Sequence, residues 1–301
     1  MHIKTYISCF IVSVSIAAGL VHANEVTLPY KGLTLNANLE LAAGKTTTDG
    51  MTLITHGGLA HRGMEMYVYL QDLFKKKGYS TLAINLSLGL NNRHAMYDCK
   101  VTHRHRYTDA ADEISAWVDW LEKKGTKRIA LIGHSRGAGE TALYAVERDN
   151  PLVKTVILLA PDTRETNDAV AYQRRYKKPL APALEEAQKL IKEGKGSTVL
   201  KHTSFLYCPD TSVAAETFVS YYGPDPRLDT AYLIPKISKP TLLVLAGDDE
   251  ILVNSKKFTP LANANGSVQI KVIDGAGHFF RDLFADEAVD VIDAFLKTQV
   301  L

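Results

Sequence analysis

The chain has 301 residues, of which 23% are charged and 46% hydrophobic, and its formal net charge is +2. This composition is ordinary for a soluble globular protein, and the length allows one large core, either as a single domain or as a domain with an insertion. The small net charge, without any Lys/Arg-rich segment interleaved with aromatic residues, speaks against nucleic-acid binding.

The first 23 residues differ from the rest of the chain. Lys4 is followed by a mainly apolar stretch over residues 6–20, and Val21-His22-Ala23 offers a small-residue cleavage site. This pattern predicts a signal peptide, because the apolar run is short for a spanning helix and has no stop-transfer flank. We therefore expect a mature domain over residues 24–301, periplasmic or secreted, with no stable membrane span.

Removal of the signal peptide leaves two cysteines, Cys99 and Cys208. An even number in an exported chain is compatible with one disulfide. Two buried free thiols are the alternative.

Short apolar segments alternate with segments of helical spacing. Helical periodicity predicts amphipathic helices, and short apolar runs between turn residues predict strands. The expected strands cover residues 25–30, 33–41, 51–55, 79–86, 128–133, 153–159, 240–246 and 268–273, and the expected helices cover 65–77, 108–124, 140–147, 255–264 and 285–297. This alternation predicts an α/β fold with a mostly parallel, doubly wound sheet.

Two segments interrupt the alternation. Residues 167–237 combine helical pieces with proline-rich connectors, which predicts an inserted helical lid and not a separate domain. Residues 87–107 form a long polar loop, for which we expect a solvated basic surface near the site. A metal site built from His94, His103 and His105 is an alternative there, although their spacing matches no known zinc pattern.

One apolar run ends in the pattern Gly-x-Ser-x-Gly, with Ser135 at its centre and Gly133 and Gly137 on either side. A strand, a tight turn and a helix at such a pattern lift the serine onto a strained elbow at the carboxyl edge of a sheet. The two glycines allow the strand and helix backbones to pass close to the turn. The pattern alone is weak evidence for a catalytic serine, so the interpretation depends on other residues, distant in the sequence, that could act with Ser135.

Three further loops follow expected strands: His56-Gly57-Gly58-Leu59, the acidic run Asp248-Asp249-Glu250, and the loop that carries His278. Ligands of such sheets bind at the carboxyl ends of the strands, so we expect these loops near Ser135. A serine hydroxyl is a poor nucleophile unless a histidine accepts its proton and a carboxylate orients that histidine.

On these residues the chain resembles the α/β-hydrolase superfamily, whose triad order is serine, acid, histidine. The resemblance extends from residue 51 to about residue 297. Residues 246–254 are similar to the acid loop of members resembling monoacylglycerol lipase and lysophospholipase, and residues 274–280 are similar to the histidine loop. The resemblance implies Ser135 as nucleophile, His278 as base, and neither a metal nor an organic cofactor.

For the acid and for one of the oxyanion donors, the sequence leaves a choice between adjacent residues. Asp249 is favoured as the acid, with Glu250 and then Asp248 as alternatives. The oxyanion donors would be the backbone N–H of Arg136 and that of Gly58 or Leu59. We expect His56 to brace its loop, and His134 and the Arg136 side chain to serve local packing.

The sequence thus predicts an exported serine hydrolase that cleaves a small carboxylic ester, as carboxylesterases and lipases do, through an acyl-enzyme intermediate. An aminopeptidase or amidase and a thioesterase on the same fold are alternatives. A catalytically silent binding protein and a metal-binding exported protein are alternatives of other classes.

Overall fold

The computed structural model describes residues 24–252, 255–264 and 266–299, so the predicted signal peptide lies outside the described residues. Its main sheet has eight strands in the order β1-β2-β4-β3-β5-β6-β9-β10. The strands β1 and β2 are antiparallel to their neighbours, and the other six run parallel. Their bounds are β1 Asn24–Tyr30, β2 Leu33–Glu40, β3 Met51–Thr55, β4 Thr81–Asn85, β5 Ile129–His134, β6 Val153–Leu159, β9 Thr241–Ala246 and β10 Val268–Ile273.

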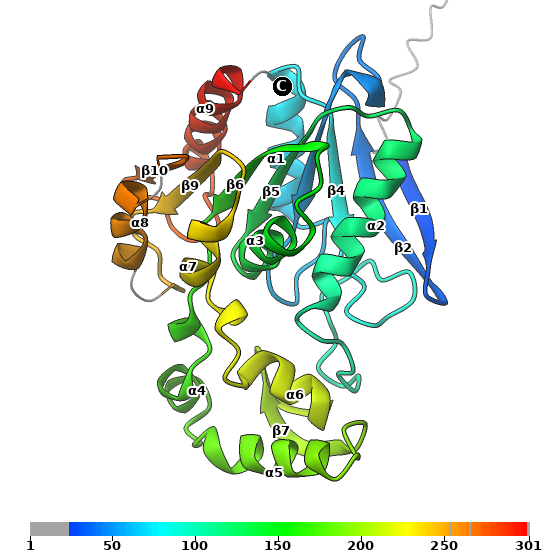
Figure 1. Cartoon of the computed structure of the whole chain (residues 1–301), viewed down its shortest axis with the longest axis vertical. Coiled ribbons are helices and arrows are strands. Elements are labelled where there is room, and N and C mark those ends of the chain that lie inside the picture. The colour runs from blue at the N-terminus through cyan, green and yellow to red at the C-terminus, as the bar shows by residue number, and fades with distance from the viewer. Residues whose placement is uncertain (1–23, 253–254, 265, 300–301) are drawn as a thin grey trace, which may run out of the picture.

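Helices cover both faces of this sheet (Figure 1). The helices α1 (Glu65–Lys76) and α9 (Leu283–Thr298) pack on one face, and α2 (Asp109–Lys123) and α3 (Arg136–Arg148) on the other. The short helix α8 (Thr259–Ala264) precedes β10. The fold is therefore the predicted mostly parallel, doubly wound α/β sheet.

The packing explains the sequence periodicity. All residues of β3, β4 and β5 are buried, as expected for parallel strands that carry helices on both faces. On α2, one apolar stripe faces the core and contributes Ile114, Trp117, Val118 and Leu121, each without exposed surface. The sheet thus separates two hydrophobic layers.

The segment between β6 and β9 forms a cap at one end of the molecule (Figure 1). The cap is built from α4 (Ala169–Tyr176), α5 (Ala181–Lys192), α6 (Ala215–Tyr222) and an antiparallel hairpin of β7 (Val199–Phe205) and β8 (Cys208–Ala214), whereas α7 (Thr230–Leu233) of the same segment packs against α3. The sequence analysis missed this hairpin. Its register shifts twice, so its side chains do not show the strict alternation typical of a strand pair.

The hairpin is joined to the loop 87–107. A disulfide connects Cys99 to Cys208, with Cα atoms 5.5 Å apart. His103 N–H donates to the carbonyl of Ser212 at 2.8 Å, and Ala214 N–H donates to the carbonyl of His103 at 2.9 Å. The cap is therefore attached covalently and by backbone hydrogen bonds on this side.

The expectation of a solvated basic surface over the loop 87–107 is wrong for three of its arginine and histidine residues. Arg93, His103 and His105 are buried. Arg93 donates to backbone carbonyls, and the ring of His103 packs against Phe205 of the hairpin with centroids 4.8 Å apart. The cap hairpin covers the loop, and this contact between distant segments had no local sequence signal.

We predict that replacing both Cys99 and Cys208 by alanine lowers the melting temperature and changes ester preference, while Ser135 still reacts with a fluorophosphonate probe. The bridge closes a loop with a sequence separation of 109 residues. In the chain-entropy model such a loop corresponds to at most about 4–5 kcal/mol of unfolding free energy. Thermal unfolding of the variant measures the loss of stability. Thiol titration of the unreduced, denatured wild type tests for the bridge itself. Two titratable thiols per mature chain would contradict the bridge.

Candidate active site

Ser135 lies at the turn between β5 and α3, with φ 56° and ψ −125°. Positive φ is unfavourable for a residue with a side chain, so surrounding contacts hold this strained elbow in place. A Cβ on Gly133 would lie 2.4 Å from the carbonyl oxygen of Gly137, and one on Gly137 would lie 2.3 Å from that of His56. The glycines of the motif are therefore required by close backbone approach, as the sequence predicted.

Three predicted residues form one hydrogen-bonded line. The Oγ of Ser135 lies 2.9 Å from Nε2 of His278, and Nδ1 of His278 lies 2.9 Å and 3.1 Å from the two carboxylate oxygens of Asp249. Ser135 and His278 are both buried, at 8% and 2% exposure. The residues lie just beyond the carboxyl ends of β5, β9 and β10.

Among the three candidate acids, the structure places only Asp249 against the imidazole. Burial raises the pKa of Asp249, but the hydrogen bond from His278 and those from the amides of Leu252 and Ile251 outweigh it, so the pKa lies below its usual range. Glu250 instead accepts the backbone N–H of His278 at 3.0 Å. Asp248 is exposed. An ionised Asp249 suits the task of holding the histidine.

The glycine loop after β3 lies beside the serine. A Cβ on Gly57 would be 2.8 Å from Cβ of Ser135, so only glycine allows this approach. The next residue, Gly58, has φ 48°. His56 braces the loop, because its Nε2 accepts Leu86 N–H at 3.0 Å and its Nδ1 lies 3.3 Å from the Gly57 carbonyl oxygen. This loop can present Gly58 or Leu59 N–H opposite Arg136 N–H, the first residue of α3.

The residues that flank Ser135 have their side chains fully packed. His134 is 1% exposed and bonds through both ring nitrogens, to Tyr67 and to the His278 carbonyl. The Arg136 guanidinium donates to Asn167 at 3.0 Å, lies 3.8 Å from Asp162 and faces the ring of Tyr221.

The cap contributes Tyr207, which the sequence analysis did not single out. A Cβ on Gly58 would lie 3.2 Å from Cε2 of Tyr207, so this ring rests on the glycine loop after β3. The guanidinium groups of Arg175 and Arg136 lie 4.9 Å and 5.9 Å from its centroid. Tyr207 precedes the bridged Cys208, so the disulfide anchors the residue that covers this side of the site.

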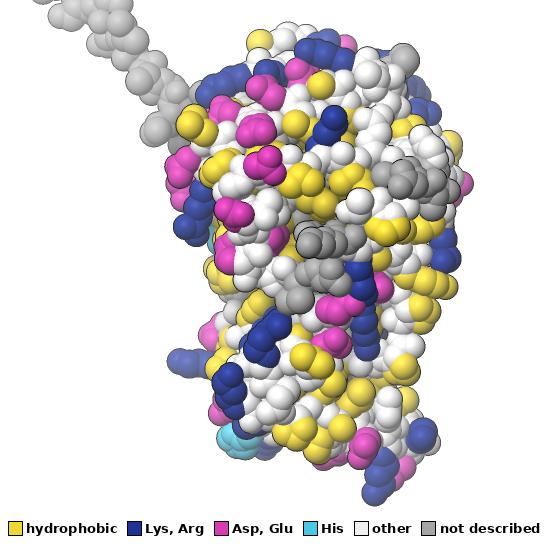
Figure 2. All heavy atoms as spheres, turned by 90° about the vertical axis from the view of Figure 1, so that its left-hand side faces the viewer, with side chains coloured by type: hydrophobic (Ala, Val, Ile, Leu, Met, Phe, Trp, Pro, Cys, Tyr) yellow, Lys and Arg dark blue, Asp and Glu magenta, His cyan; other side chains and the backbone are white. Residues whose placement is uncertain are grey.

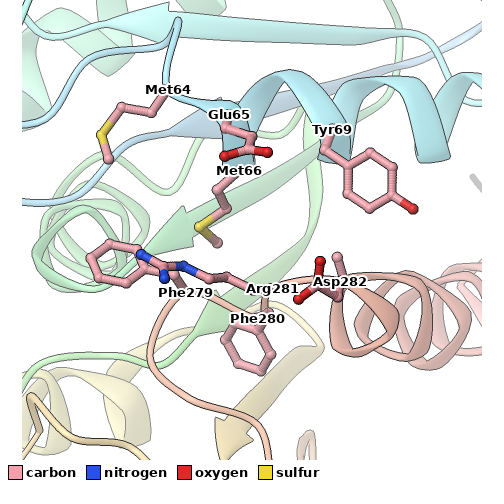
Figure 3. A pocket seen from close by; sticks show the side chains of 9 residues that line it. Met64, Glu65, Met66, Tyr69, Phe279, Phe280, Arg281 and Asp282 are labelled. Atoms are coloured by element: carbon pink, nitrogen blue, oxygen red, sulfur yellow. The ribbon is translucent and has the colours of Figure 1, made fainter.

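A hollow of about 560 Å³ lies next to the histidine loop (Figure 3). Its walls are Phe279 and Phe280, which follow His278, and Met64 and Met66 at the start of α1. The rings of Phe279 and His278 lie 5.1 Å apart. The hollow therefore shares a wall with the histidine loop, although Ser135 and His278 do not line it.

The histidines of the loop 87–107 do not converge on one point. His103 Nδ1 lies 3.2 Å from His105 Nε2, whereas His94 bonds to Asn92 and to Glu25. Within residues 24–252, 255–264 and 266–299, no group of three or more His, Cys, Asp or Glu side chains is placed to hold a metal ion.

Charged side chains of both signs are interspersed with hydrophobic ones on the face shown in Figure 2. This face has no continuous basic stripe of the kind that binds nucleic acid. In the part of the chain that the structure describes, no helix has both the length and the apolar character needed to cross a membrane.

Comparison with known proteins matches residues 53–294 to the model of the alpha/beta hydrolase family. The chain belongs to this family. Two relatives, each named "Putative esterase/lipase 2", come from Mycoplasma pneumoniae and Mycoplasma genitalium. The first is 28% identical over 70% of this hydrolase and 76% of its own length. The second is 28% identical over 75% of this hydrolase and 83% of its own length.

Solved structures share the hydrolase's fold. Est1E from Butyrivibrio proteoclasticus with bound ferulic acid superposes with a TM-score of 0.67 at 18% identity, over 91% of this chain and 99% of its own. A monoacylglycerol lipase from Paleococcus ferrophilus superposes with a TM-score of 0.60 at 17% identity, over 88% of this chain and 99% of its own. At such identities the likeness shows the fold alone.

Proposed function

We propose that this hydrolase is a serine esterase that cleaves small carboxylic esters with Ser135, His278 and Asp249. The observation that carries the proposal is the continuous hydrogen-bonded line from Ser135 Oγ through His278 to Asp249. The names of the two relatives, esterase/lipase, support an ester as the substrate class.

The chemistry follows from this line. Ser135 Oγ bonds to the ester carbonyl carbon while its proton passes to His278 Nε2, and Asp249 stabilises the imidazolium through Nδ1–H. The backbone N–H groups of Arg136 and of Gly58 or Leu59 stabilise the oxyanion. The carbon–alkoxy bond then breaks as His278 protonates the leaving alcohol.

The second half of the reaction, hydrolysis of the acyl-enzyme, repeats these steps with water in place of the serine. His278 removes a proton from water, whose oxygen bonds to the acyl carbon, and the bond to Ser135 Oγ then breaks with return of the proton to the serine. The products are an alcohol and a carboxylic acid, and the residues return to their initial states.

Fluorophosphonate labelling combined with a substrate panel tests the proposal. We expect one label per chain on Ser135, and faster hydrolysis of p-nitrophenyl esters graded by acyl length than of a matched thioester or aminoacyl amide. A folded protein that takes no label would contradict a serine hydrolase and favour a silent binding protein. Faster turnover of the amide or of the thioester would contradict an ester as the substrate class and favour an amidase or a thioesterase.

Export to an oxidising compartment is part of the proposal. It is supported by the sequence of residues 1–23 and by the Cys99–Cys208 bridge, a bond typical of exported proteins. Cleavage after Ala23 would leave every described residue of the first strand, Asn24–Tyr30, in the mature chain. The mass of the protein from cell fractions tests this: a chain that retains residues 1–23 in the cytoplasm would contradict export.

A further inference from the structure

A buried chain of hydrogen bonds joins the three loops of the site. Gly57 N–H donates to Oη of Tyr67 at 2.9 Å, and this Oη lies 2.9 Å from Nδ1 of His134. Nε2 of His134 lies 2.9 Å from the carbonyl oxygen of His278. The chain thus runs from the glycine loop, through the residue before the nucleophile, to the backbone of the base.

Every donor and acceptor in this chain has one consistent assignment. The carbonyl of His278 only accepts, so Nε2 of His134 carries the hydrogen. Burial, with the charge of His278 adding to it, lowers the pKa of His134 to about 3, so the ring is neutral and its Nδ1 accepts from Tyr67 O–H. The hydroxyl of Tyr67 in turn accepts from Gly57 N–H.

The ends of the chain are backbone atoms of reacting elements. Gly57 lies beside Ser135, since a Cβ on it would be 2.8 Å from Cβ of Ser135, and it precedes Gly58, a proposed oxyanion donor. The peptide groups of His278 are held on both sides, by His134 at the carbonyl and by Glu250 at the N–H. A shift of about 1 Å in such a group can cost roughly 100-fold in rate.

We propose that Tyr67 and His134 are positioning residues that hold the glycine loop after β3, which carries the proposed oxyanion donors, and the catalytic histidine in the correct position relative to Ser135. The proposal rests on the serine esterase function above. Neither residue touches the reacting atoms, and both are almost completely buried, at 2% and 1% exposure. Their effect should appear in turnover and not in substrate binding.

The first test is Tyr67→Phe, with hydrolysis of p-nitrophenyl acetate expressed per fluorophosphonate-titrated site. We expect kcat to fall about ten- to 100-fold while KM stays within about two-fold, because geometry at the reacting carbon is lost. Tyr69→Phe is the matched control: it removes a hydroxyl from the same helix, bonded to Asp286 at the surface, and should leave kcat unchanged. A purely structural role would lower the melting temperature or the titrated fraction but not kcat per site.

A double-mutant cycle with His134→Ala tests the coupling. Because both residues lie in one chain, we expect the double variant to lose little more than the worse single variant. His134→Gln, which keeps an N–H near the His278 carbonyl, should retain more turnover than His134→Ala. If Tyr67→Phe does not fold, the comparison of the two His134 variants decides.

Three outcomes would overturn the proposal: kcat of folded Tyr67→Phe within two-fold of wild type, losses that multiply in the double variant, or equal turnover per site of His134→Gln and His134→Ala. If wild type takes the label but hydrolyses no ester, the ester substrate is wrong, and the labelling rate constant replaces kcat in the same comparisons. A wild type that takes no label overturns both proposals.

Discussion

Ser135→Ala is expected to abolish ester hydrolysis and fluorophosphonate labelling while the fold persists. Removal of Oγ deletes the nucleophile and its bond to His278, and loss of a triad serine costs roughly 10⁴- to 10⁶-fold in turnover. The backbone strain at this position does not change, because alanine has the same Cβ. Turnover, labelling and circular dichroism together measure the result.

Ser80→Ala is a suitable control for this variant. Ser80 is also a buried serine, but its Oγ accepts Ala42 N–H at the opposite end of the sheet. It should retain full turnover. Retention of most of the activity by folded Ser135→Ala protein would refute the assignment of the nucleophile.

Asp249→Asn is expected to lower kcat by about 10³- to 10⁴-fold, by analogy with other triads. An amide nitrogen facing Nδ1 of His278 would favour the wrong tautomer and remove the charge that stabilises the imidazolium. Labelling by fluorophosphonate should slow in parallel. The melting temperature should change little, because asparagine has nearly the same shape.

The neighbouring carboxylates provide the controls. Asp248→Asn alters an exposed side chain and should be neutral. Glu250→Gln keeps an oxygen that can accept His278 N–H, so we expect a mild effect. A collapse of turnover in Glu250→Gln alone, with Asp249→Asn active, would transfer the acid role to Glu250.

Local patterns predicted the sheet because they depend on neighbouring residues. The short, mainly apolar strand over residues 51–55 and the apolar stripe of the helix over 108–124 can be recognised from the local pattern alone, and both are present as β3 and α2. The cap hairpin could not be recognised. Its strands are stabilised by Cys99 and His103 of a distant loop, and these contacts leave no pattern in residues 199–214.

By itself, the sequence determined the fold class, the elbow at Ser135 and the set of loops at the strand ends, because spacing and residue type encode these directly, and its motifs carried the resemblance to the hydrolase family. The tertiary structure decided the rest. Which of three adjacent carboxylates faces His278 depends on a turn of backbone that places Asp249 toward the imidazole and Glu250 toward its amide. The contact of Tyr67 with His134, and that of Tyr207 with Gly58, join residues 67 and 149 positions apart, and only folding brings such residues within hydrogen-bonding or van der Waals distance.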